Sequence, residues 1–301
     1  MRKIILLLLL SAFISGCSSL SKSQIETVQQ FGEVTSNFSA YPSAIMEELA
    51  EIRLKRGLYY ASTLTDPMRH LDELDSIYSQ KKYDYKVSEK IDVTFRVLDK
   101  YAQSLVLLSS GDYTANLQNN AAEFGVGMDS LVNLYNVKSN AEKLPAGIGE
   151  ALGKIVGFSG DRYIKVKQSE KIKEYVTKAD TLVLIMTSNL LEYLESSNLE
   201  ELISYEEKMI RRNYLTYLQL TDTGTFESQR EYLDLKSNLD AAKDLKALTI
   251  QSTKDLQAAH KELVQVVQKK QKLHSTIKEL RVFYQQVAEI RETLNALKKD
   301  K

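Results

Sequence analysis

LQAAHKELVQVVQKKQKLHSTIKELRVFYQQVAEIRETL, residues 256–294, is the stretch that decides the fold. Alternating steps of three and four residues pick out a mostly apolar row, a heptad seam that extends backwards less regularly through Leu235, Ala242 and Leu245. The row is Leu256, Ala259, Leu263, Val266, Lys270, Leu273, Ile277, Leu280, Tyr284, Val287, Arg291 and Leu294. A continuous helix of about 60 residues with this seam would be about 90 Å long. Such a stripe needs a partner helix to cover it.

The segment before the seam is the natural partner. It repeats the same spacing at Ile172, Val176, Ala179, Val183, Met186, Leu190 and Tyr193. Ser197 with Glu200 resembles a capping box that restarts the helix after a kink, and Thr221 to Thr225 is a polar turn. The sequence therefore predicts a long antiparallel helical hairpin, with residues 161–220 packed against 226–299.

The N-terminal half of the chain continues the helical pattern. Asp66 and Pro67 are a strong helix start, with Asp as N-cap and Pro at the first helical position. We expect helices over 24–38, 42–64, 67–81, 86–110 and 113–140, lying along the hairpin, with a possible break at Gly125–Gly127. No alternating strand pattern is sustained. The predicted fold class is all-α, an elongated helical bundle with a long C-terminal hairpin that is similar to a coiled coil.

The N-terminus has the three parts of a bacterial export signal in their fixed order. Arg2 and Lys3 supply positive charge, an apolar run follows from Ile4 to Ile14, and Ile14-Ser15-Gly16-Cys17 closes the segment. The apolar run is too short for a stable transmembrane helix. The closing tetrapeptide resembles the lipobox of bacterial lipoproteins. That resemblance implies cleavage between Gly16 and Cys17, and transfer of a diacylglycerol and a further acyl chain, such as palmitate, to Cys17.

Cys17 is the only cysteine in 301 residues, as acylation at one position requires. The alternative is an ordinary cleaved signal peptide with an incidental cysteine. Ser18 stands where lipoproteins kept at the inner membrane typically carry Asp, so the resemblance favours the cell outer membrane, with the body facing the periplasm. The expected division is 1–16 signal peptide, 17–24 lipidated tether, 25–144 N-terminal helices, 145–160 glycine-rich connection and 161–301 helical hairpin.

Composition argues against several kinds of partner. Loss of Arg2 and Lys3 with the signal leaves 38 basic against 40 acidic residues, which gives no long-range field for nucleic acid. No second apolar run is long enough to span a bilayer. We therefore expect membrane contact through the lipid on Cys17, a protein partner in the envelope, and no nucleic acid. The seam over 235–294 also offers a surface for homo-oligomers.

No pattern of catalytic or metal-binding residues emerges. His70, His260 and His274 lie outside any HExxH or Cys/His cluster, and we interpret His260 and His274 as solvated residues at the edge of the seam. The segment 157–161, GFSGD, begins like a nucleophile elbow, but it lacks the final glycine and a preceding strand. We expect no catalytic residues, no metal, no cofactor and no enzymatic activity.

The segment PAGIGEALGKIVGFSG, residues 145–160, holds five of the twelve glycines of the chain. Glycine costs up to about 1 kcal/mol in a helix interior, so this composition needs a reason. The main alternatives are a tight, packed connection at the end of the bundle, close helix approach along small residues, and an apolar tip that enters a bilayer surface. Residues available for membrane or partner contact are Ile148, Gly149, Leu152, Gly153, Val156, Gly157 and Phe158.

A second unusual segment interleaves Tyr83 and Tyr85 with lysines. Such a pattern can stack on ring-shaped ligands, but we interpret it as a solvated loop between helices. The function that these patterns favour is a lipid-anchored interaction or scaffold protein of the cell envelope. A membrane-acting helical protein that uses residues 145–160, similar in outline to α-helical pore-forming toxins, is one alternative. An inhibitor or immunity lipoprotein for a secreted effector is another.

Overall fold

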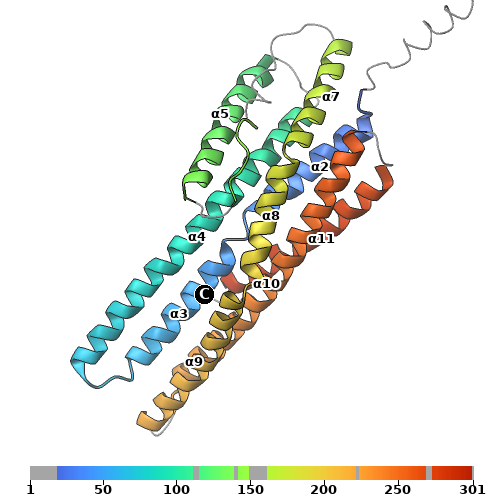
Figure 1. Ribbon diagram of the computed structural model, residues 1–301. Coiled ribbons are helices and arrows are strands. Elements are labelled where there is room, and N and C mark those ends of the chain that lie inside the picture. Colours follow the sequence, from blue (N-terminus) through green and yellow to red (C-terminus); the bar gives the residue numbers. More distant parts are fainter. Residues whose placement is uncertain are drawn as a thin grey trace, which may run out of the picture.

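The computed structural model describes residues 19–110, 115–138, 142–148, 161–221, 224–268 and 273–299. Within these ranges the regular structure is helical, with no β-strand, and the helices form one elongated bundle (Figure 1). This confirms the all-α prediction. The helices are α2 (Lys22–Ser39), α3 (Ala44–Ala61), α4 (Pro67–Ser109), α5 (Ala115–Lys138), α7 (Asp161–Lys178), α8 (Asp180–Leu194), α9 (Ser197–Thr221), α10 (Phe226–Val267) and α11 (Leu273–Lys299).

The predicted hairpin is present in its first arm and in the first half of its second arm. The line α7–α8–α9 runs antiparallel to α10 and packs against it along its length (Figure 1). Ile172, Val176, Val183 and Met186, predicted to face α10, are all buried. The kink is also present, but Ser196 caps the new helix one residue earlier than expected, since its Oγ accepts from the Leu199 amide.

The second arm differs from the prediction of one continuous helix over 226–299. α10 ends at Val267, and α11 begins at Leu273 and folds back to pack against α10. Between the two helices the seam passes through a run in which every residue is polar, Gln268 to Lys272. The seam is consequently covered within the chain: Leu256, Leu263 and Leu280 are buried, whereas Ile277 and Tyr284 remain exposed.

Two consecutive helices, α2 and α3, form a second line along the bundle. Both pack against α4, and both contact α10. α2 starts with a complete capping box, in which Ser21 and Gln24 bond each other's backbone amides. α4 starts as predicted, with Asp66 as N-cap and Pro67 in the first turn.

α4 continues without interruption through residues 82–85, so the predicted loop and the two helices 67–81 and 86–110 are wrong. Tyr83 and Tyr85 are exposed residues of this helix. Asp84 between them is buried and makes an ion pair with Arg53 of α3. The polar composition therefore reflects one helix face in water and a buried charge on the other. α5 is likewise continuous through Gly125–Gly127.

His260 lies at the centre of the bundle, where α2, α4, α8 and α10 meet. It is 1% exposed, so the interpretation as a solvated edge residue is wrong. Its Nε2 is 2.8 Å from the Tyr101 hydroxyl and its Nδ1 is 3.2 Å from Asp180 Oδ1, while Phe31 packs on its ring. The seam prediction assumed one covered face on α10, but α10 is covered on several faces. His274 lies in α11, where its side chain is outside the described part.

The chain enters the bundle three residues after Cys17. Leu20 is buried, and its backbone amide donates to Ser169 Oγ of α7 at 3.0 Å. The Gln24 side chain donates to the Val266 carbonyl near the end of α10. Of the expected tether 17–24, residues 20–24 thus belong to the folded body. Gly16 and Cys17 lie outside the described residues.

The glycine-rich connection is described only at its start. Leu144 and Ile148 are buried, and the backbone of Gly147 has a positive φ of 78°. Burial of Ile148 is expected if this segment is a packed connection. Gly149, Leu152, Gly153, Val156, Gly157 and Phe158 lie outside the described residues, so their proposed contacts stay predictions. Among the helices that the structure does describe, none is both long and apolar enough to cross a membrane.

Candidate functional site: a polar groove between α3, α4 and α9

A groove with a volume of about 620 Å³ lies between α4 and α9, with α3 as its floor. The groove lies in one half of the bundle (Figure 1). At the end of this half, α3 and α9 end and α4 and α10 begin, and we call it the distal end. The lining of the groove is mostly polar. The lining residues that the argument uses are Arg53, Arg56, Gln80, Asp84, Tyr205 and Arg212.

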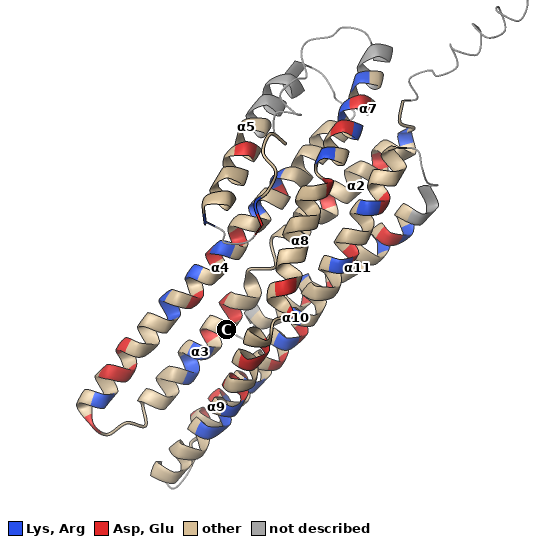
Figure 2. Cartoon of the chain, in the orientation of Figure 1, with Lys and Arg blue, Asp and Glu red and all other residues tan. Residues whose placement is uncertain are grey.

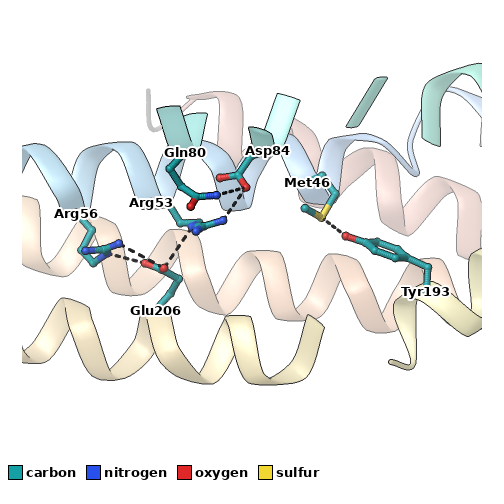
Figure 3. Close-up of polar contacts among 7 residues, drawn as sticks. All are labelled: Met46, Arg53, Arg56, Gln80, Asp84, Tyr193 and Glu206. Carbon is teal, nitrogen blue, oxygen red and sulfur yellow. Dashed lines mark hydrogen bonds and ion pairs between the residues drawn. The ribbon is translucent and has the colours of Figure 1, made fainter. Parts of the chain in front are cut away.

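Two arginines of α3 hold the walls of the groove in place (Figure 3). Arg53 Nη1 donates to Asp84 Oδ1 of α4 at 2.6 Å, and Arg53 Nε lies 3.4 Å from Glu206 Oε1 of α9. Arg56 Nε donates to Glu206 Oε2 at 2.7 Å. Arg53 therefore bridges the two walls, and Glu206 accepts hydrogen bonds from Arg56 and forms an ion pair with Arg53.

The carboxylates of this cluster are buried more deeply than the arginines. The side chains of Glu206 and Asp84 are 0% and 2% exposed, against 15% for Arg53. Burial raises the pKa of Asp84 above its usual value, and the Arg53 guanidinium opposes this change. Gln80 also donates to Asp84 Oδ1, at 3.0 Å. A charge cluster that is paired and hydrogen-bonded in this way fixes side-chain positions, because each ion would be costly to leave without its partners.

A further contact, between α8 and α3, lies beside the charge cluster (Figure 3). The Tyr193 hydroxyl donates to Met46 Sδ at 2.8 Å (Figure 3). Burial raises the pKa of Tyr193 to about 12, so the hydroxyl stays protonated at neutral pH.

Large apolar side chains are exposed around the distal end, beyond the groove. They come from the last turns of α3 and α9 and the first turns of α4 and α10, and they are Leu58, Met68, Leu71, Leu215, Leu220, Phe226 and Leu233. Behind them, Tyr214 stacks on Tyr232 with ring centroids 4.4 Å apart, and Tyr59 packs beside Tyr214 and Tyr217. This aromatic cluster packs α3 against the ends of α9 and α10 and lies beneath the exposed apolar residues.

The groove offers an exposed guanidinium at Arg212. Asn213 is buried and its amide donates to the Arg56 carbonyl, and the carboxylates are already paired. Within the described ranges no group of three or more His, Cys, Asp or Glu residues is placed to hold a metal ion.

The groove was not predicted from the sequence, although one signal for it was available. α9 carries a row at steps of three and four, Leu199, Ile203, Glu206, Ile210 and Asn213, and every member is buried. A carboxylate inside an otherwise apolar row signals a buried ion pair. The identity of its partners could not be read, because Arg53 and Arg56 lie about 150 residues away.

Comparison with protein-family models, with curated proteins and with solved structures found no match to this chain.

Proposed function

We propose that this chain is a lipid-anchored protein of the cell envelope that presents a rigid helical body to a protein partner and catalyses no reaction. The observation that carries the partner role is the set of exposed apolar side chains at the distal end, beside a groove with fixed polar walls. Contiguous apolar surface on a folded protein is typical of interaction sites.

The lipid anchor rests on the lipobox and gains support from the start of the folded body. Three residues of extended chain span at most about 11 Å. With Cys17 acylated and Leu20 packed into the bundle, the body would stay at the bilayer surface, and the distal end would lie far from the lipid.

The anchor is tested by growth of expressing cells with an alkyne-bearing palmitate analogue. We expect the chain to incorporate the label and fractionate with the outer membrane. Cys17→Ser should lose both properties, and Ser18→Ala is the matched control for labelling. Label on the Cys17→Ser chain, or none on the unaltered chain, would refute acylation at this position.

The partner role is tested with a photo-crosslinking amino acid placed singly at Tyr205 or Arg212 on the groove rim. A control position is Arg281, an exposed residue of α11. We expect one envelope protein to be captured from both rim positions and not from the control. Capture that does not depend on position would count against the groove. A specific hydrolytic or transfer activity of the purified chain would overturn the non-enzymatic proposal.

A further inference from the structure

The outer face of α4, opposite the groove, is covered in one half of the helix and bare in the other. In the covered half, Val93 is buried and the side chain of Lys100 lies against Gly127 of α5. Lys86 lies seven residues before Val93 on the same face, but it is exposed. α5 ends at Lys138, whose Nζ lies 2.9 Å from Glu89 of α4. Among the described residues, no helix covers this face from Pro67 to Glu89 (Figure 1).

The bare face carries large apolar side chains at the spacing of a helix-packing stripe. Steps of three and four residues from Met68 reach Leu71, Asp75, Tyr78, Lys82 and Tyr85. The exposed fractions of Met68, Leu71, Tyr78 and Tyr85 are 68%, 56%, 68% and 42%. The Tyr85 hydroxyl donates to Glu51 of α3 at 2.8 Å, so Met68, Leu71 and Tyr78 are the residues of this row that a second helix could cover.

The charges along this face are ordered so that they complement a reversed copy of themselves (Figure 2). On this face Asp72 and Asp75 come first along α4, and Lys82 and Lys86 follow. Glu73, Lys81 and Asp84 line the groove on the other side of the helix. Asp72, Asp75, Lys82 and Lys86 are exposed. None of these four forms an ion pair within the part of the chain that the structure describes, although their neighbours Lys81, Asp84 and Glu89 do.

We propose that two copies of this chain associate through the outer face of α4, antiparallel, about a twofold axis near Tyr78 and Ser79. In this register Asp75 of each copy lies opposite Lys82 of the other, and the two Tyr78 rings flank the axis. The length also fits. The bare face extends from the start of α4 to the end of α5. In the dimer the first turn of α4 in each copy would reach α5 of the other copy, and the two α4 helices would pair over about 33 Å.

A second copy accounts for these observations better than an unrelated partner, because one twofold axis satisfies both charge clusters at once. The groove is lined by the opposite side of α4, although Met68 and Leu71 also belong to the apolar set at the distal end. Antiparallel pairing sends the two N-termini to opposite ends of the dimer, so two chains anchored in the same leaflet could not pair in this way. The proposed dimer also replaces the 235–294 seam as the surface for homo-oligomers, since the apolar residues of that seam are mostly buried within the chain.

The test is reciprocal charge reversal in the detergent-solubilised full-length chain, with molar mass measured by light scattering. We expect the unaltered chain to be dimeric and its dimer dissociation constant to rise at least tenfold in Asp75→Lys and in Lys82→Asp. The doubly reversed chain should recover the dimer. A mixture of the two single variants should also recover it, as a heterodimer, because each then faces the opposite charge.

A disulfide reporter checks the register without altering charge. Ser79→Cys should form a disulfide-linked dimer under mild oxidation, and Ser237→Cys on the exposed face of α10 should not. The unaltered chain controls for Cys17. A monomeric unaltered chain, or a dimer that all the charge variants leave unchanged, would overturn the proposal. So would a chain whose Ser79 position captures a different protein but never a second copy.

Discussion

Glu206 and Glu207 are neighbours in α9 with opposite surroundings. Glu206 is fully buried and pairs with Arg53 and Arg56, whereas Glu207 is 59% exposed and pairs with Lys243 at 3.0 Å. The pair therefore isolates the effect of burial on a carboxylate from the effect of its position in the helix.

We expect Glu206→Gln to lower the free energy of unfolding by about 3 kcal/mol, because it leaves the largely buried Arg56 guanidinium without its anion and leaves Arg53 with Asp84 alone. Glu207→Gln should cost less than about 1 kcal/mol, since an exposed ion pair is screened by water. Urea unfolding followed by circular dichroism measures both. Equal losses would mean that the cluster does not stabilise the groove.

At the residue scale the sequence was least informative. His260 was interpreted as solvated and Tyr83 and Tyr85 as loop residues, because local composition alone was read. The residues that decide these two cases lie far away in the sequence. Tyr101 is 159 residues from His260, and Arg53 is 31 residues from Asp84. Heptad spacing reports which face of a helix is apolar, but it does not report how many neighbours surround that helix.

At the scale of elements, α2 and α4 approach each other closely at Gly32. A Cβ atom built there would lie 2.7 Å from the Ala102 carbonyl oxygen and 2.9 Å from Val106 Cγ2. At Gly127, where α5 crosses α4, the nearest atom is Lys100 Cε at 3.1 Å. The first neighbour is backbone and cannot move alone, while the second is the far end of a flexible side chain.

Gly32→Ala should therefore destabilise the protein by about 1–3 kcal/mol through overpacking. Gly127→Ala should instead stabilise it by up to about 1 kcal/mol, since alanine is the better helix former. Thermal unfolding of the two variants beside the unaltered chain measures the difference. A stabilising Gly32→Ala would show that α2 and α4 are free to separate at this point.

Helix existence was well predicted from periodicity, and helix ends less so. The starts of α4 and α9 were indicated by Asp66–Pro67 and by the serines near 197, because caps act locally. The end of α10 was missed, because the seam was counted across the polar run Gln268 to Lys272. The fusion of 67–81 with 86–110 was missed because a buried ion pair at Asp84 permits a charged segment to remain helical.

At the scale of the whole molecule, Leu20 fixes where the body begins. Its side chain is buried and its amide bonds Ser169. Leu20→Ala removes most of this packing, which costs about 2 kcal/mol or more for a buried leucine. Opening of the first turn should become more frequent, and the first cleavable lysine there is Lys22.

We expect trypsin to cleave after Lys22 at least about tenfold faster in Leu20→Ala, because cleavage follows the population of the open form. Mass spectrometry of the new N-terminus reads the cut. Leu233→Ala, which truncates an exposed leucine of α10, should leave the rate unchanged. An unchanged rate in Leu20→Ala would mean that the first turn of α2 is held without Leu20.

The overall architecture was largely predictable, since an all-α bundle and a long hairpin follow from apolar periodicity. The groove was not, because it exists only where α4 and α9 flank α3, and no local pattern sets the distance between two walls. The bare face of α4 was not predicted for a related reason. Its apolar row runs through residues that were predicted to form two helices and a loop, so it was not recognised as one row.

The length of the bundle is set by more than one element. α10 has 42 residues and α4 has 43, and each runs unbroken beside a line of helices that is interrupted, at 40–43 in α2–α3 and at Glu195–Ser196 in α8–α9. A residue gained or lost by mutation can be absorbed at an interruption, whereas in α4 or α10 it would rotate everything beyond it by about 100°. The separation between the two ends of the molecule is therefore buffered against insertions and deletions, and such changes should collect at the interruptions as the sequence diverges.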